Sequence, residues 1–236
     1  MRVAALAGSL AAGVRIAAEV EQLPAVDVSI ICCNVGMKPP FLRWLRELAL
    51  LFKSWLWRTY TTTLWRYARS GKLIILNREL EDPESLQRLK SLECDIGLHA
   101  TNAIYRQATI AAFRLGILNA HIGILPGYRG RSVAEWSVLQ GDPTGITVFF
   151  IDSGIDTGSR IVLREYIPST NSNNVQALKT MLFGCDVRLY RKALEALASE
   201  EFQCQPNEVC KGKRYYVMSR MFTKVVDDIL GTRADY

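Results

Sequence analysis

The stretch that decides the fold is Leu115-Gly-Ile-Leu-Asn-Ala-His-Ile-Gly-Ile-Leu-Pro-Gly-Tyr-Arg-Gly130. Its first seven residues form a short apolar run that ends in polar groups, which is typical of a buried strand that meets a crevice. Alternate side chains of a strand share one face, so we expect Asn119 and His121 to point the same way. The chain then turns at residues 125–130, where proline presets one backbone dihedral angle and glycine frees the next.

A second predicted strand occupies residues 145–151, which are rich in β-branched and aromatic side chains. Residues 152–154 read as a loop, and Asp156 follows in the run Gly154-Ile-Asp-Thr-Gly158. The ends of two strands can therefore bring a carboxamide, an imidazole and a carboxylate together. A buried polar side chain costs free energy unless it has a hydrogen-bond partner. Polar groups in apolar segments therefore indicate a functional role.

These three groups suit acyl transfer. A carboxamide N–H and an imidazolium N–H can donate to the oxygen that becomes negative in a tetrahedral intermediate. A carboxylate can orient and charge the imidazole, or accept a proton from an attacking amine. No Ser or Cys nucleophile stands in this motif, which favours direct attack by a substrate amine over a covalent acyl-enzyme. Each residue alone is more simply explained as a structural or capping group, but the joint spacing favours catalysis.

Several spaced elements together resemble the folate-dependent formyltransferase family, which includes glycinamide ribonucleotide formyltransferase, methionyl-tRNA formyltransferase and the sugar N-formyltransferases. The elements are residues 119–130, Trp136, Gly141-Asp142, Gly145-Ile-Thr147 and Ile155-Asp-Thr-Gly158. The resemblance is strongest over residues 95–163. It implies an α/β fold, with a Rossmann-like formyltransferase domain, a mostly parallel sheet and a short C-terminal extension. It also implies 10-formyltetrahydrofolate as the formyl donor and a catalytic trio that falls on Asn119, His121 and Asp156. One departure is Gly123, where many relatives have Ser.

The resemblance further implies where the folate would bind. In the family, the loop after the strand predicted at residues 94–100 lines the pteridine pocket largely through backbone groups. The residues of this chain assigned to folate contact are Leu98, Ala100, Ile104, Leu125 and Asp152. His99 is the other of the two histidines, and an ordinary strand-end hydrogen bond explains it more simply than a folate contact. No metal site is expected.

Charge and length bear on the acceptor. The 236 residues carry a formal net charge of +6, which favours anionic partners such as nucleotides, phosphorylated sugars, folate polyglutamate, nucleic acid or an acidic membrane. We expect the primary amine of a nucleotide-linked amino sugar as acceptor, with glycinamide ribonucleotide second, and hydrolysis by water stays open. The tail is expected to be too short for the barrel domain of tRNA-directed members, so no nucleic-acid partner is expected.

Residues 41–69 form an unusual basic stretch that holds four of the five tryptophans. A basic, tryptophan-rich amphipathic helix can lie on an anionic membrane surface. We favour instead a helical insertion, residues 39–70, packed on the domain with a solvated basic face. A hypothesis of another class makes the chain a non-catalytic relative that binds folate or nucleotide, or that docks on a membrane. The intact trio argues against it.

The remaining predictions concern organisation. A strand at residues 3–7, a helix at 11–22 and a strand at 26–35 indicate a doubly wound sheet. Further helices are predicted at 83–90, 108–115, 133–139, 175–199 and 222–230. We expect a catalytic domain over 1–170 and a C-terminal helix and extension over 171–236. Six cysteines without a Cys-x-x-Cys pair indicate buried free thiols and no zinc site. Without a convincing signal peptide or an apolar run that could span a bilayer, we expect a cytoplasmic protein, and a homodimer stays open.

Overall fold

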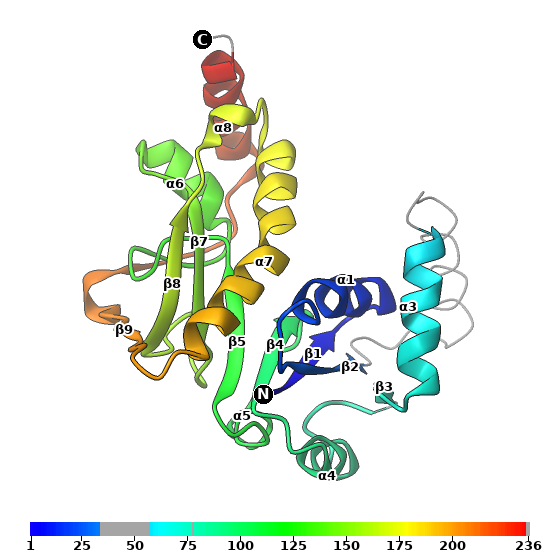
Figure 1. Cartoon of the computed structure of the whole chain (residues 1–236). Helices are drawn as coiled ribbons and strands as arrows, with labels where there is room; N and C mark the ends of the chain where they lie inside the picture. The colour runs from blue at the N-terminus through cyan, green and yellow to red at the C-terminus, as the bar shows by residue number, and fades with distance from the viewer. Residues whose placement is uncertain (34–56, 77, 235–236) are drawn as a thin grey trace. The chain divides into compact units, whose positions relative to one another are not determined.

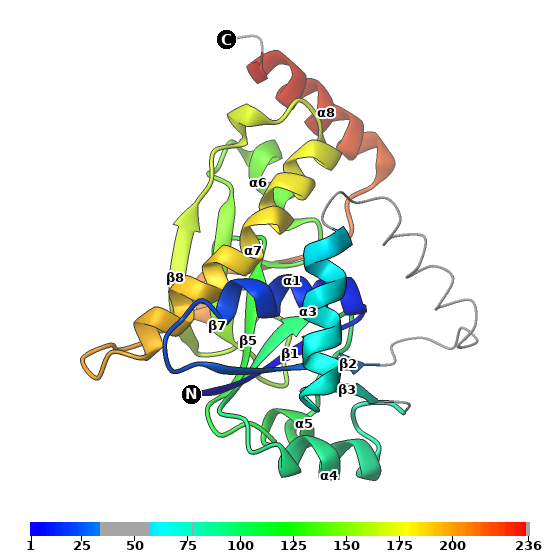
Figure 2. The same cartoon turned by 45° about the vertical axis from the view of Figure 1, so that its right-hand side comes forward.

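The computed structural model describes residues 1–33, 57–76 and 78–234 (Figures 1 and 2). The chain forms two compact units, Met1–Leu118 and Asn119–Tyr236. The division falls inside strand β5 (Gly116–His121), whose two halves belong to different units. The predicted domains 1–170 and 171–236 place the boundary elsewhere and stay a prediction.

Parallel strands form the sheet of the first unit. They are hydrogen-bonded in the order β3 (Leu73–Leu76), β2 (Asp27–Cys33), β1 (Arg2–Ala7), β4 (Ile96–Ala100) and β5. Each of these neighbouring pairs is parallel. Strand β1 is buried from Val3 to Ala7, as expected for a parallel strand covered on both faces. The order, with β1 between β2 and β4, is that of a doubly wound sheet, so the predicted α/β class is confirmed.

Helices α1 (Leu10–Val20), α3 (Trp57–Arg69), α4 (Pro83–Ser91) and α5 (Gln107–Ile110) accompany this sheet (Figure 1). The side chain of Asp82 caps α4 by accepting from the amide of Glu84, as predicted. Gly13 lies within α1, where a Cβ would come within 2.5 Å of Ile30 Cγ2. This glycine therefore allows α1 to pack closely on β2.

The helix predicted at residues 108–115 is wrong beyond Ile110. The amides of Arg114 and Leu115 donate to the carbonyls of Cys94 and Asp95, at 3.2 and 2.8 Å. These bonds draw the chain into the start of β5, so the helix ends after one turn. A long-range pairing thus overrides the local apolar pattern.

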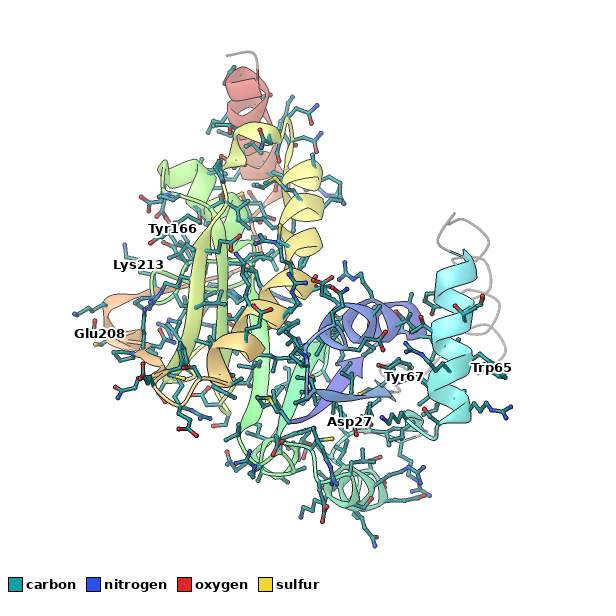
Figure 3. The ribbon with its side chains drawn as sticks, in the orientation of Figure 1. Asp27, Trp65, Tyr67, Tyr166, Glu208 and Lys213 are labelled. Carbon is teal, nitrogen blue, oxygen red and sulfur yellow. The ribbon has the colours of Figure 1, made fainter. Side chains whose placement is uncertain are left out.

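The described part of the basic stretch is helix α3, and residues 39–56 lie outside the described residues. Tyr67 is buried, and its hydroxyl donates to Glu21, the C-cap residue of α1, at 3.0 Å. Burial, followed by the charge of Glu21, raises the pKa of Tyr67. Trp65 is 63% exposed and projects away from the helix on the other side, with the Arg69 guanidinium over its ring (Figure 3). This part therefore packs on α1, as the insertion hypothesis expects.

In the second unit, the hydrogen-bonded order is β5, β7 (Gly145–Phe150), β8 (Arg160–Tyr166) and β9 (Gln205–Pro206). Strand β8 is antiparallel to both β7 and β9. A separate pair joins β6 (Tyr128–Gly130) to β10 (Lys213–Tyr215) in parallel. The sheet of the second unit is therefore partly antiparallel.

Three helices accompany these strands. Helix α7 (Val175–Leu197) lies along β7 and β8, while α6 (Val133–Gln140) and α8 (Arg220–Ala234) contact each other (Figure 1). Single 3-10 turns occupy Ser169–Asn171 and Val209–Lys211. In the described part of the chain, no helix is both long enough and apolar enough to cross a membrane.

The six cysteines are all free. Cys32, Cys33 and Cys94 are buried, and burial raises the pKa of the Cys94 thiol to about 11. Cys185 and Cys204 are half-buried. The expectation of buried thiols is wrong for Cys210, which is exposed because it lies in a surface 3-10 turn.

Candidate active site

Strand β5 carries the first two members of the predicted trio. Asn119 is half-buried and His121 is 8% exposed. Ala120, which lies between these two residues, ties the strand to α7, because its amide donates to the Tyr190 hydroxyl at 3.0 Å. Within the described residues, nothing hydrogen-bonds the Asn119 carboxamide. Among those residues, its amide group is therefore a donor that no side chain or carbonyl engages.

Both ring nitrogens of His121 face oxygen acceptors. Nε2 lies 2.8 Å from the backbone carbonyl of Tyr128, and Nδ1 lies 3.5 Å from Oδ1 of Asp156. A carbonyl oxygen only accepts, so Nε2 must carry a hydrogen. A neutral imidazole has a single N–H, which would leave the Nδ1 lone pair pointing at a carboxylate. When the ring carries both protons, its second N–H, on Nδ1, lies on the side of the Asp156 carboxylate.

Asp156 is held in place at its side chain and its backbone. Its side chain is 12% exposed, and Oδ2 accepts from the Gly130 amide at 2.8 Å. Its backbone has φ +52°, in the left-handed region that asparagine and aspartate enter more readily than other non-glycine residues. Position 130 also requires a glycine, because its φ is +102° and a Cβ would lie 2.2 Å from the Tyr215 carbonyl oxygen. The carboxylate thus faces the imidazole from a fixed loop.

The turn between His121 and Tyr128 leaves no room for a side chain at Gly123. A Cβ there would meet His121 Nε2 at 2.8 Å, the Tyr128 carbonyl at 2.9 Å and Val133 at 3.0 Å. The position where the sequence departs from many relatives is therefore in contact with the imidazole. The absence of a side chain at Gly123 lets the His121 ring reach the Tyr128 carbonyl.

Tyr128 itself is anchored through its ring. Its hydroxyl contacts the side chains of Asp142 and Gln140, and the ring stacks on Tyr215 at a centroid distance of 5.1 Å. Burial, and then the bond to Asp142, raise the pKa of Tyr128. The phenol therefore stays neutral and holds the turn whose carbonyl meets His121.

The residues assigned to folate contact are spread over both units. In the first unit, Leu98 is fully buried within β4, the Ala100 carbonyl accepts from the Gly8 amide at 2.9 Å, and Ile104 is 82% exposed. Leu98 therefore offers no side-chain surface to a ligand. Ile104 is the residue of this group whose side chain is open, and its role stays a prediction.

The other two lie in the second unit. Leu125 is 1% exposed and packs with Phe149 and Ile161. Its backbone groups are already engaged, because its amide donates to the Thr147 hydroxyl and its carbonyl accepts from Arg164. Asp152 instead organises the loop before Asp156, since its Oδ1 accepts from the Gly154 amide at 2.9 Å and the Thr157 hydroxyl at 2.7 Å. Any folate role of either residue stays a prediction.

The sequence did not indicate several groups that shape this site, namely the Tyr128 carbonyl, the Gly130 amide, Tyr190 and Asn207. Tyr128 and Gly130 lie in the recognised turn, but a backbone group carries no residue-type signal. Asn207 donates to the carbonyls of Asp156 and Gly158, at 3.4 and 3.0 Å, from the C-terminal segment. Nothing in the local sequence near residue 207 points to this contact.

Comparison with known proteins now decides the family. The family model described as formyl transferase matches residues 65–194, which is more than half of the chain. The chain belongs to the formyl transferase family. A methionyl-tRNA formyltransferase of Parabacteroides distasonis is 30% identical over 145 residues, which cover 61% of this chain and 44% of that protein. The chain thus spans less than half the length of this curated relative.

Solved formyltransferase structures share the fold. Phosphoribosylglycinamide formyltransferase from Bacillus halodurans aligns with a TM-score of 0.57 and 20% identity, over 85% of this chain and 96% of that one. A 4-N formyltransferase from Francisella tularensis gives 0.61 and 13%, over 99% and 87%. PseJ from Anoxybacillus kamchatkensis, solved with UDP-4,6-dideoxy-4-formamido-L-AltNAc and tetrahydrofolate, gives 0.56 and 15%, over 99% and 100%. At these identities the likeness shows the formyltransferase fold alone.

Proposed function

We propose that this protein transfers a formyl group from 10-formyltetrahydrofolate to a primary amine. The observation that carries the proposal is the pair of His121 and Asp156, at 3.5 Å, with Asn119 two residues before His121 on strand β5. Membership of the formyl transferase family supports it. The nearly complete overlap with a neighbour solved with tetrahydrofolate is consistent with the same donor.

The proposed reaction forms a tetrahedral intermediate and then breaks it down. The amine nitrogen attacks the formyl carbon, and the carbonyl electrons move onto oxygen, where the Asn119 carboxamide and a His121 N–H donate to the developing charge. In the structure, Nε2–H of His121 bonds the Tyr128 carbonyl. During the reaction this N–H would instead donate its hydrogen bond to the formyl oxygen. The intermediate then collapses, the bond to the folate nitrogen breaks, and that nitrogen takes up the proton that the amine released.

Asp156 has two roles in this scheme. Its carboxylate stabilises the positive charge on His121, and it accepts the proton that the amine loses, directly or through one water. No covalent enzyme intermediate is needed, because the attacking nitrogen belongs to the substrate. Such folate-linked metabolism is proposed to take place in the cytoplasm.

For the acceptor we propose an anionic amine, with a nucleotide-linked amino sugar first. The net charge of +6 favours such a molecule. The neighbours that overlap nearly all of this chain include PseJ, whose structure holds a UDP-linked formamido sugar. Glycinamide ribonucleotide is a second candidate because of the Bacillus halodurans neighbour, and methionyl-tRNA is a third because of the curated relative.

A transfer assay tests this function. The purified protein is incubated with 10-formyltetrahydrofolate and each amine, and both tetrahydrofolate release and a formyl mass gain on the acceptor are measured. We expect His121→Ala to lower kcat by about 10²–10⁴-fold with an unchanged circular dichroism spectrum. A His121→Ala protein with the wild-type rate would refute the proposed role. Folate release without any acceptor gain would indicate hydrolysis instead.

A further inference from the structure

The loop that carries Asp156 depends on one side chain from far along the chain. Asn207 is 7% exposed and follows β9. Its Nδ2 donates to the carbonyls of Asp156 at 3.4 Å and Gly158 at 3.0 Å, and its backbone amide donates to the carbonyl of Ser159 at 2.9 Å. One residue therefore fixes the backbone of the loop at three places.

The orientation of the Asn207 amide follows from its neighbours. Two carbonyl oxygens can only accept, so the NH₂ group must face them and Oδ1 must point away. Oδ1 is buried and has no hydrogen-bond partner within the described residues. An unpartnered buried acceptor destabilises the folded state, because it loses its hydrogen bonds to water. The site therefore bears a stability cost in order to place two donors under the loop.

Asp156 needs this support because its backbone is left-handed, with φ +52°. Non-glycine residues adopt that region at a cost in free energy and persist there where their surroundings hold them. The backbone carbonyl of Asp156 is held by Asn207, while its carboxylate is held by the Gly130 amide at 2.8 Å. With both ends fixed, Oδ1 is left facing Nδ1 of His121 at 3.5 Å.

The Gly130 amide, which holds the Asp156 carboxylate, is itself held by the C-terminal segment. The Tyr215 carbonyl accepts from the Arg131 amide at 3.1 Å and closes against the bare Cα of Gly130. Gly212 packs against the Pro126 carbonyl, where a Cβ would lie 1.6 Å away. Residues 205–217 thus brace the loop, the strand β6 and the turn that surround His121.

We infer that Asn207 is a positioning residue that sets the Asp156 carboxylate against the His121 imidazole, a role that rests on the proposed formyl transfer. Asn207 touches no reacting atom. Its loss would leave the Asp156 backbone free to leave the left-handed region, and the carboxylate would move with it. A displacement of about 1 Å at a catalytic group can lower the rate about 10²-fold.

Two variants separate positioning from stability. Asn207→Leu removes the donors together with the unpaired Oδ1, and replacing a buried polar group by an apolar one of similar shape can be nearly neutral for stability. Asn207→Asp keeps the shape and replaces the donor nitrogen with an oxygen that repels both carbonyls. Glu208→Gln is the matched control, because the neighbouring Glu208 side chain is exposed at the edge of the segment and pairs with Lys211 (Figure 3).

The first readout is kinetic. We expect both Asn207 variants to lower kcat about 10–100-fold with a KM within about threefold of the wild type, since substrate groups are not contacted. Glu208→Gln should retain the wild-type values. The unfolding midpoint of each variant shows whether the fold persists, and a folded Asn207→Asp protein suffices if Asn207→Leu does not fold.

The second readout does not need activity. The chain has two histidines, so ¹⁵N-labelled histidine gives two pairs of ring-nitrogen signals, and His99→Gln assigns which pair belongs to His121. We expect the His121 ring nitrogen shifts at fixed pH to change in both Asn207 variants. The His99 signals should not move, because that ring bonds Tyr105 at 2.8 Å in the first unit.

The outcomes are distinct. Wild-type kcat and unchanged His121 shifts in both folded variants would overturn the positioning role. Changed His121 shifts together with a lower kcat would support it. Changed His121 shifts in a protein whose wild type transfers no formyl group would retain the positioning of Asp156 and refute the proposed function.

Discussion

At the scale of single residues, the site depends on what is missing at Gly123 as much as on what is present. His121 Nε2 reaches the Tyr128 carbonyl through the space that a Cβ would occupy. A backbone carbonyl moves only with the turn, whereas an imidazole can rotate. Any side chain at residue 123 is therefore expected to displace the imidazole first.

Gly123→Ala should lower kcat by about tenfold or more, because His121 would lose its present position against Asp156. Overpacking of a filled site also costs about 1–3 kcal/mol of unfolding free energy. The measurements are steady-state formyl transfer and denaturant unfolding.

Gly127→Ala is the matched control in the same turn, since its Cβ would meet only the Ile124 carbonyl, at the ordinary distance of 3.4 Å. Its rate and stability should stay near those of the wild type. If Gly123→Ala behaved like this control, the His121 position would not depend on the missing side chain.

At the scale of elements, a charge cluster joins β8 to α7. Glu165 of β8 bonds Arg188 and Lys192 of α7, and its contact with Lys192 is 2.8 Å. The bond to Arg188, and then that to Lys192, lower the pKa of Glu165 from 4.5 to about 2. The cluster lies beside the apolar contact through which α7 covers the sheet of the second unit.

This cluster predicts a pH dependence of stability. Because the folded-state pKa of Glu165 is depressed, its contribution is fully present above about pH 4.5 and is lost as the pH falls toward 2. The side chains of the cluster are between 27% and 47% exposed, so solvent screening limits the effect to about 1 kcal/mol.

Glu165→Gln should therefore show a smaller loss of unfolding free energy between pH 5 and pH 2.5 than the wild type, measured by urea unfolding at each pH. Glu200→Gln removes one carboxylate from the exposed turn after α7 and serves as the charge control. Parallel pH curves for Glu165→Gln and the wild type would contradict the assignment.

At the scale of the whole molecule, the reactivity of the cysteine thiols measures how closed each of the two units is. Cys32, Cys33 and Cys94 are buried in the first unit, whereas in the second unit Cys185 and Cys204 are half-buried and Cys210 is exposed. A thiol reacts as the thiolate, so burial protects it both by excluding the reagent and by raising its pKa, as at Cys94.

Alkylation of the native protein should therefore modify Cys210 first, and the three cysteines of the first unit only when that unit opens. Mass spectrometry of peptides over a time course, without and with denaturant, measures the order. Cys210→Ser should remove the fast phase. Early labelling of Cys94 in the native protein would show that its strand edge is open.

The sequence alone determined a large part of this protein. Strands β1, β5 and β7, the Asp82 cap and helix α7 were predictable, because period, capping chemistry and β-branched runs act within a few residues. The turn at residues 125–130 and the spacing of Asn119, His121 and Asp156 identified the family for the same reason. Where a local pattern competed with a distant strand, as at residues 111–115, the prediction failed.

Only the tertiary structure decided which groups surround His121. The Tyr128 carbonyl and the Gly130 amide are backbone atoms, which every residue type provides, so no residue name marks them. Asn207 acts on Asp156 from 51 residues further along the chain, and Gly123 matters only because an imidazole has taken its space. Local structure follows from residue types and short spacings, so it can be predicted from the sequence. Contacts between distant segments are fixed only when packing brings those segments together.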